Sequence, residues 1–345
     1  MKILAIESSC DETAAAIVEN GTNILSNVVI SQIDIFAEYG GVIPEVAARS
    51  HLEAIMPVVH KALQDARSDW GDIDAIAVTH TPGLLGSLLV GTLTARTLAI
   101  LHNKPFYAVH HLKSHIYANW LETPNQDQPK FPVLSLVISG GHTQILYMKA
   151  HNHFEIIGTS HDDAVGECFD KVAKILGLPY PGGPSIAKVA QNGDRKKYQF
   201  PHPKVENLDF SFSGLKTAVL RRVQKELGLP ISFPSHELAS KLTEKQVADF
   251  AASFEQTAIE ILLEKLKLAQ TIYPAESIVI AGGVSANTLL RETAKKQFEH
   301  VSFPKPEFSG DNAAMVGAAC YYEIESGVQP SDPYHLNILP RSEIK

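Results

Sequence analysis

The chain has 345 residues, of which 45% are hydrophobic and 20% charged, and it carries a net charge of −8. This length predicts about two domains, and the negative average charge disfavours general binding of polyanions. Three widely spaced cysteines (Cys10, Cys168 and Cys320) argue against a disulfide framework and against a cysteine-only metal site. They indicate a reducing compartment such as the cytoplasm, and the N-terminal apolar run ends at Glu7, too early for a secretory signal.

The first third of the chain predicts three strands followed by alternating helices and strands. The expected strands are residues 2–7, 13–20, 23–31, 73–79 and 106–109, and the expected helices are residues 44–67, 83–101 and 110–120. The helix over 83–101 carries one charge, Arg96, which would cost roughly 2.5–3.5 kcal/mol inside a bilayer. We therefore predict a buried core helix there. A polar, proline-rich linker follows over 121–132.

After the linker the pattern restarts. LAIESSCDETAAAIV (4–18) and LSLVISGGHTQILYM (134–148) share one order of elements: an apolar strand, a turn of small and hydroxyl residues, and a second strand. Each is followed by a third strand and a helix, which predicts a duplicated α/β fold with two lobes and a cleft between them. The expected lobes are 1–130 plus 308–345, and 131–307. A long helix (243–270), the strand 277–283 and two more helices complete the chain.

Both polar turns could bind phosphate, because successive small residues expose backbone N–H groups; the alternative is a pair of ordinary tight turns. A nucleophilic Cys10 is disfavoured, since Asp11 and Glu12 beside it raise the pKa of a thiol. These two acids could orient water, a metal or a substrate amine, or could be solvated turn carboxylates.

A possible metal site comes from His111 and His115, which lie four residues apart and share one face of a helix. The zinc-protease pattern HExxH needs a glutamate where this chain has Leu112. Asp311 is the plausible third ligand, although it could equally cap the helix that follows it. Two histidines and one carboxylate suit iron and zinc alike.

Two glycine-containing turns could approach a ligand: Gly282-Gly283 after a strand, and YPGGP (180–184) after the helix that contains Asp170. Asp170 could bind a ribose hydroxyl or be a surface acid. The segment 188–225 has nine basic residues against three acidic ones, a net charge of +6. Such a segment favours a nucleic-acid backbone, with a solvated lysine face as the alternative.

These motifs together resemble one family, the tRNA N6-adenosine threonylcarbamoyltransferases (TsaD), once called glycoproteases. The resemblance rests on eight motifs in chain order: ESSCDET (7–13), GGVIPEVAARSH (40–51), HHLKSH (110–115), VISGGHTQ (137–144), GECFDKVAKILGLPYPGGP (166–184), FSFSGLKTA (210–218), AGGVSAN (281–287) and FSGDNAAM (308–315). It implies an actin-like, sugar-kinase and Hsp70-type (ASKHA) fold. It also implies transfer of threonylcarbamoyl from threonylcarbamoyl-AMP to N6 of the adenosine beside the anticodon, in tRNAs that read codons beginning with adenine.

The resemblance further implies one metal, usually iron, on His111, His115 and Asp311. The residues implied to hold the adenylate are Val137, Ile138, Ser139, Gly140, Gly141, Asp170, Gly183 and Asn287. Some relatives carry an aspartate where this chain has Ala187. The implied protein partners are an inactive paralogue (TsaB-like) and a small ATPase (TsaE-like).

We add two hypotheses to the resemblance: Asp11 or Glu12 accepts the proton of the attacking amine, and the basic segment binds tRNA through Arg195, Lys196, Lys197, Arg221 and Arg222. The rival functions are a metal-dependent peptidase and a non-catalytic nucleotide-binding module of the same fold class. Neither rival needs a polyanion-binding surface.

Overall fold

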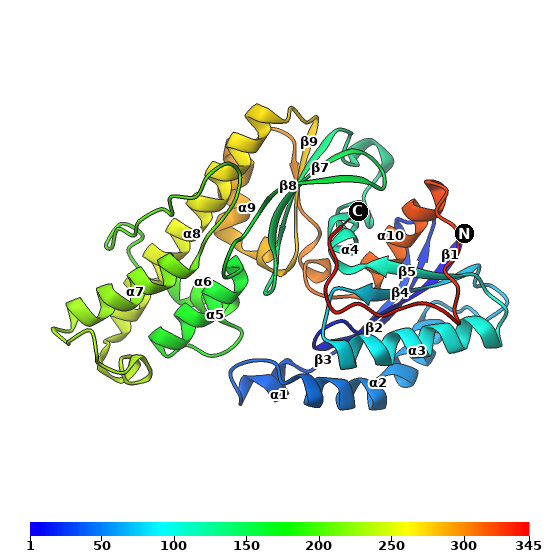
Figure 1. The fold of residues 1–345 in the computed structure, drawn as a ribbon, viewed down its shortest axis with the longest axis horizontal. Coiled ribbons are helices and arrows are strands. Elements are labelled where there is room, and N and C mark those ends of the chain that lie inside the picture. The colour runs from blue at the N-terminus through cyan, green and yellow to red at the C-terminus, as the bar shows by residue number, and fades with distance from the viewer. Residues whose placement is uncertain (345) are drawn as a thin grey trace. The chain divides into compact units, whose positions relative to one another are not determined.

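The computed structural model describes residues 1–344, and the chain divides into two compact units (Figure 1). The first unit comprises Met1–Val133, Met148–Glu155 and the C-terminal part from Ser302; the second comprises Leu134–Tyr147 and Ile156–Val301. Each unit has its own sheet and helices.

The sheet of the first unit has the strand order β3-β2-β1-β4-β5. Its strands are β1 (Lys2–Glu7), β2 (Glu12–Glu19), β3 (Asn23–Ser31), β4 (Ala75–Thr81) and β5 (Phe106–His110). β1 pairs antiparallel with β2 and parallel with β4, and β4 pairs parallel with β5. Strands covered on both faces read as continuous apolar runs, as β1 and β4 do. Because Glu7 pairs with Ala14, ESSCDET is the turn that joins β1 to β2.

Helices cover both faces of this sheet. α2 (Pro44–Asp65) and α3 (Leu85–Leu101) pack together on one face, and α10 (Ala313–Glu325) packs on β1 and β2 from the other (Figure 1). Gly317 permits that approach, since a Cβ there would lie 2.8 Å from Val18. The short helices are α1 (Ile33–Ala37), α4 (His111–Tyr117) and the 3-10 turns Ala118–Trp120, Asn125–Asp127 and Pro306–Phe308.

The predicted core helix over 83–101 is buried on one face only. α3 turns its small residues toward the sheet, where a Cβ on Gly91 would meet the Ser8 hydroxyl. Leu88 and Leu98 are buried on the same side, whereas Leu93 is 48% exposed and Leu101 71%. Close packing of small side chains and burial of these two leucines together hold this helix to the sheet. In the part of the chain that the structure describes, no helix has the length and apolar character that crossing a membrane requires.

The second unit repeats the topology of the first. Its sheet has the order β10-β9-β6-β7-β8, and the strands are β6 (Val133–Ile138), β7 (Thr143–Ala150), β8 (His153–Thr159), β9 (Ser277–Ala281) and β10 (Val301–Ser302). Read from β8, this order matches β3-β2-β1-β4-β5 strand for strand. The predicted duplication is therefore confirmed, although the two halves share a pattern of elements and not a sequence.

In the second unit, α6 (Gly182–Ala190) packs on α5 (Val165–Leu176) and on α8 (Glu244–Ile272). α8 begins at a capping box, in which Thr243 and Gln246 bind each other's backbone N–H groups. The other helices are α7 (Ser213–Glu226) and α9 (Thr288–Gln297), with 3-10 turns at Ser235–Glu237, Ala239–Lys241 and Gly283–Ala286.

Gly282 directly follows β9 and packs against the end of β6. Its φ is +88°, in the left-handed region, and a Cβ there would lie 2.4 Å from the carbonyl oxygen of Ile138. Only glycine fits such a position without displacing backbone. The neighbouring Gly283 differs, because no atom lies within 4 Å of the place where its Cβ would stand.

We therefore expect Gly282→Ala to lower the free energy of unfolding of the second unit by about 2 kcal/mol, since both backbone strain and a backbone clash oppose it. Gly283→Ala is the matched control and should change it by less than about 0.5 kcal/mol. Urea denaturation of the purified variants measures both. Equal effects from the two substitutions would contradict this account of the turn.

Candidate functional site

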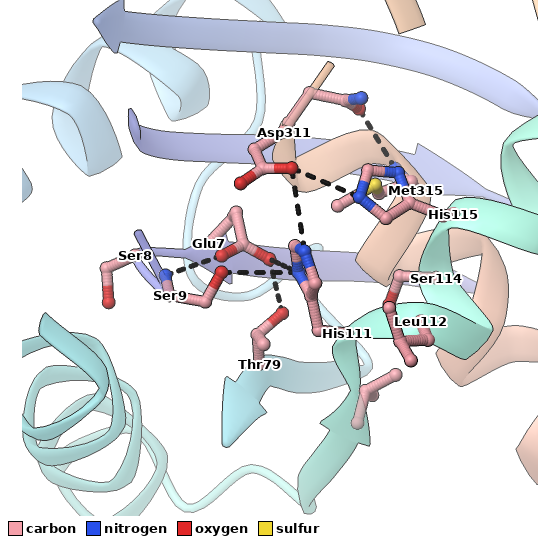
Figure 2. Close-up of polar contacts among 12 residues, drawn as sticks. Glu7, Ser8, Ser9, Thr79, His111, Leu112, Ser114, His115, Asp311 and Met315 are labelled. Carbon is pink, nitrogen blue, oxygen red and sulfur yellow. Dashed lines mark hydrogen bonds and ion pairs between the residues drawn. The ribbon is translucent and has the colours of Figure 1, made fainter. Parts of the chain in front are cut away.

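Functional side chains of the first unit gather where its three parallel strands end. Glu7 is the last residue of β1, Thr79 lies near the end of β4, and His111 directly follows β5. Ligands of open α/β sheets bind at this edge, because helices cover the faces while the strand ends remain available. Asp311 reaches the same place from the segment just before α10 (Figure 2).

His111, His115 and Asp311 form one cluster, and their potential ligand atoms all lie within 4.8 Å of one another. Oδ1 of Asp311 is 3.1 Å from Nε2 of His115 and 3.5 Å from Nε2 of His111 (Figure 2). The i, i+4 spacing on α4 thus places both imidazoles against one carboxylate, as the spacing predicted.

The residues present fit a metal ion. His115 is 1% exposed: its Nε2 faces Asp311, and its Nδ1 makes no hydrogen bond among the described residues, so the buried ring depends on what binds at Nε2. The alternative role of Asp311 as helix cap was wrong, since Asn312 caps α10 by accepting from the N–H of Met315. Nitrogen, nitrogen and carboxylate oxygen are ligands that Fe²⁺ and Zn²⁺ share.

The electrostatics of the cluster favour a cation. Burial by itself lowers the pKa of His111, but Asp311 and Glu7 outweigh it and raise that pKa to about 9. Around the same place, burial and the charge of Asp311 raise the pKa of Asp11 and bring that of Glu12 well above its usual value. Carboxylates that destabilise one another in this way are stabilised by an added positive charge.

Hydrogen bonds from residues distant in sequence fix the turn that carries Asp11 and Glu12. The backbone N–H of Gln32 donates to the carbonyl of Asp11, and Ser31 Oγ donates to Glu12 Oε1 at 3.1 Å. The buried ring of His51 contacts the Cys10 carbonyl through Nε2 at 3.0 Å. Burial and the neighbouring acids raise the pKa of Cys10 well above its usual value, so the thiol is a poor nucleophile, as predicted.

The predicted nucleotide-binding residues all lie in the second unit, at or near the equivalent strand ends. Val137 and Ile138 end β6, and the turn after it is closed by the Ser139 N–H donating to the carbonyl of His142. Apart from its own residue, its chain neighbours and, for Gly183, the backbone of its own helix, a Cβ placed on Gly140, Gly141 or Gly183 would have no atom of residues 1–344 within 4 Å, so the backbone is open to a ligand at each. Asp170 Oδ1 accepts from the N–H of Gly182 at 2.7 Å and thereby ties α5 to α6, the helix that contains Ala187.

Sequence reasoning missed Glu255, which connects two residues predicted to bind different ligands. It is 2% exposed, accepts from Asn287 Nδ2 at 2.8 Å, and pairs with Arg195 at 3.3 Å. Asn287 also caps α9, because its Oδ1 accepts from the N–H of Leu290. The available signal was an acid on the mainly apolar stripe of α8 that is buried.

The five residues predicted to bind tRNA have different surroundings. Lys196, Lys197 and Arg221 are exposed. Arg195 binds the buried Glu255, and Arg222 lies over the ring of Tyr198 and 3.6 Å from Glu226. The guanidinium of Arg221 also donates to Oε1 of Gln224 at 2.9 Å and to the carbonyl of Ile231 at 3.0 Å. Of the five, Lys196 and Lys197 are therefore the best placed to reach a ligand.

The family described as TsaD, tRNA N6-adenosine threonylcarbamoyltransferase, matches this chain over residues 23–318. The chain belongs to this family. Relatives of that name include one from Christiangramia forsetii, 49% identical over 94% of this chain and 93% of its own length. Another, from Symbiobacterium thermophilum, is 47% identical over 98% and 95%, and one from Staphylococcus haemolyticus is 46% identical over 94% and 92%.

Solved structures agree on the fold. HypF from T. kodakarensis has a TM-score of 0.62 at 14% identity, covering 94% of this chain and 48% of its own. The activator of the 2-hydroxyisocaproyl-CoA dehydratase from Clostridium difficile has a TM-score of 0.51 at 14% identity, covering 96% and 100%. Identities this low show the fold alone, and they confirm the predicted actin-like α/β class.

Family membership confirms the predicted enzyme class. The chain is an acyltransferase that modifies tRNA, and it transfers a threonylcarbamoyl group to the N6 amine of adenosine.

His115→Ala should abolish stoichiometric binding of Fe²⁺ or Zn²⁺, because it removes one of the three ligands of the cluster. His60→Ala, at an exposed position of α2, is the control and should bind metal as the unmodified chain does. Elemental analysis after reconstitution and desalting measures the difference. Full metal content in the His115 variant would remove this residue from the site.

Proposed function

We propose that the chain takes the threonylcarbamoyl group from threonylcarbamoyl-AMP and transfers it to the adenosine beside the anticodon, in tRNAs that read codons beginning with adenine. The metal centre and the acidic pair of residues 1–130 plus 308–345 would perform the transfer, and residues 131–307 would hold the adenylate and tRNA. The observation that carries the proposal is the buried cluster of two histidines and a carboxylate, flanked by two carboxyls of raised pKa.

We propose Fe²⁺ as the bound metal, with Zn²⁺ as the alternative, on His111, His115 and Asp311. Two histidines and one carboxylate on one side of an ion leave its other positions open, which suits a site that must also accept substrate oxygen. The metal would supply Lewis-acid stabilisation of negative charge on the carbonyl or phosphate oxygens.

Asp11 or Glu12 would accept the proton that the attacking amine loses. When the N6 amine attacks the carbamoyl carbon, a C–N bond forms, the C–O bond to phosphate breaks, and AMP leaves with the bonding electrons. The amine must lose one proton, and Asp11 or Glu12 would accept it. A carboxyl with a raised pKa is a better base near neutral pH than one with an ordinary pKa, provided that enough of it is ionised.

No covalent enzyme intermediate is needed, because the mixed anhydride already carries a good leaving group. The chain's contribution is to orient the two reactants and to stabilise the charge that develops on oxygen. In the second unit, the open backbone at Gly140, Gly141 and Gly183 would admit the adenylate. We propose that the enzyme works in the cytoplasm with a TsaB-like paralogue and a TsaE-like ATPase, as the family resemblance implies.

Glu12→Gln should lower the rate of transfer by about 100-fold or more while leaving adenylate binding unchanged, since the amide cannot accept the proton. The assay incubates the protein, with and without its partners, with threonylcarbamoyl-AMP and unmodified tRNA, and detects the modified nucleoside by mass spectrometry. Glu19→Gln, at the other end of β2, is the matched control. Full transfer rates for both Glu12→Gln and Asp11→Asn would contradict the assignment of the base to this pair.

Replacing both Lys196 and Lys197 by alanine should weaken tRNA binding and reduce the slope of log affinity against log salt by about one unit for each phosphate that the protein no longer binds. Lys295 and Lys296, an adjacent exposed pair on α9, provide the control substitution. Filter binding at several salt concentrations measures the slopes. If both double variants behave alike, the effect is one of overall charge and not of the segment 188–225.

A further inference from the structure

Glu7 is a carboxylate that the mechanism above does not use, although it lies in the middle of the site. Its side chain is fully buried at the end of β1. The backbone N–H of Ser9 donates to Oε1 at 2.6 Å, and the Thr79 hydroxyl donates to Oε2. Oε2 also lies 3.3 Å from Nδ1 of His111 (Figure 2). Such a site is expensive for a charge unless several donors satisfy it.

The hydrogen bonds of Glu7 decide the proton position on His111. Both carboxylate oxygens of Glu7 already accept, Oε1 from the backbone N–H of Ser9 and Oε2 from the hydroxyl of Thr79. An ionised carboxylate only accepts hydrogen bonds. The contact at Oε2 therefore requires a proton on Nδ1 of His111, and Ser9 Oγ lies 3.2 Å from the same nitrogen.

A proton on Nδ1 leaves Nε2 as the metal-binding atom of the neutral ring. Nε2 is the nitrogen that lies 3.5 Å from Asp311, so the tautomer and the geometry agree. His115 has no comparable support, since its Nδ1 makes no hydrogen bond among the described residues. Of the two histidines, His111 is the one whose orientation the protein determines.

We propose that Glu7 is the positioning residue of the metal centre: held by Ser9 and Thr79, it fixes the ring orientation and tautomer of His111 and thereby sets the affinity for the metal. This inference rests on the proposed metal site. Glu7 does not touch the ion or the substrate in this assignment. Carboxylates that accept from the second nitrogen of a metal-bound histidine generally strengthen its binding, and losing one weakens metal affinity about 10–100-fold.

Glu7→Gln separates this role from simple filling of space. If the amide oxygen of the new glutamine faces His111, its NH₂ group faces the N–H of Ser9, and two donors oppose each other. If the amide is reversed, its NH₂ group faces Nδ1 of His111 and favours the tautomer with the proton on Nε2. A protonated Nε2 cannot bind the metal. Either arrangement disturbs the network without changing the volume of the side chain. Glu323→Gln is the matched control, because Glu323 is also buried in the first unit but pairs with Lys113 and no metal ligand.

The experiment measures the Kd for Zn²⁺ by competition with a chromophoric chelator, beside thermal unfolding of the metal-free proteins. We expect Glu7→Gln to raise the Kd by about 10–100-fold, Glu7→Asp to raise it less, and Glu323→Gln to leave it near the unmodified value. Should Glu7→Gln fail to fold, Glu7→Asp carries the test, because it keeps the charge but withdraws it from Nδ1.

Two outcomes overturn the inference, and a third overturns its basis. Unchanged Zn²⁺ affinity in both Glu7 variants would show that the carboxylate does not act on the metal centre. An equal loss in Glu323→Gln would show a general effect of removing a buried charge. If the unmodified chain binds no Zn²⁺ or Fe²⁺, the proposed metal site itself fails, and the inference fails with it.

Discussion

The position of β1 in its sheet is the constraint on which the rest of the first unit depends. β1 pairs antiparallel with β2 on one side and parallel with β4 on the other. The end of β1 therefore carries the turn to β2 and lies beside the end of β4. The turn to β2 carries Asp11 and Glu12, and the parallel side brings Thr79 and His111. One strand end thus joins the acidic pair to the candidate metal ligands.

The end of β1 concentrates negative charge. The carboxylates of Glu7, Asp11, Glu12 and Asp311 lie at or near this strand end, where they are largely buried. They shift the pKa values of one another and of His111. Without a bound cation, these four carboxylates lower the stability of the folded state, because burial disfavours each negative charge. A cluster that lowers stability in this way is typical of a functional site.

The second unit has the same strand order but different residues at the ends of its strands. Its equivalent turn contains Gly140 and Gly141 in place of acids, and the end of β9 lies against β6 through the left-handed Gly282. Small residues here leave the backbone exposed, whereas the first unit fills the equivalent place with side chains. The two units thus have similar strand ends, of which one carries acidic side chains at its turn and the other carries glycines.

The sequence by itself determined the duplicated α/β fold, the i, i+4 histidine pair and the family, because periodicity and short motifs depend on neighbours along the chain. Only the tertiary structure decided that Glu7 supports His111, that Asn312 caps α10, and that α3 exposes one face. It alone showed that Glu255 joins Asn287 to Arg195. These facts rest on contacts between residues that lie far apart in sequence, or on which face of a helix meets the sheet, and no local pattern records either.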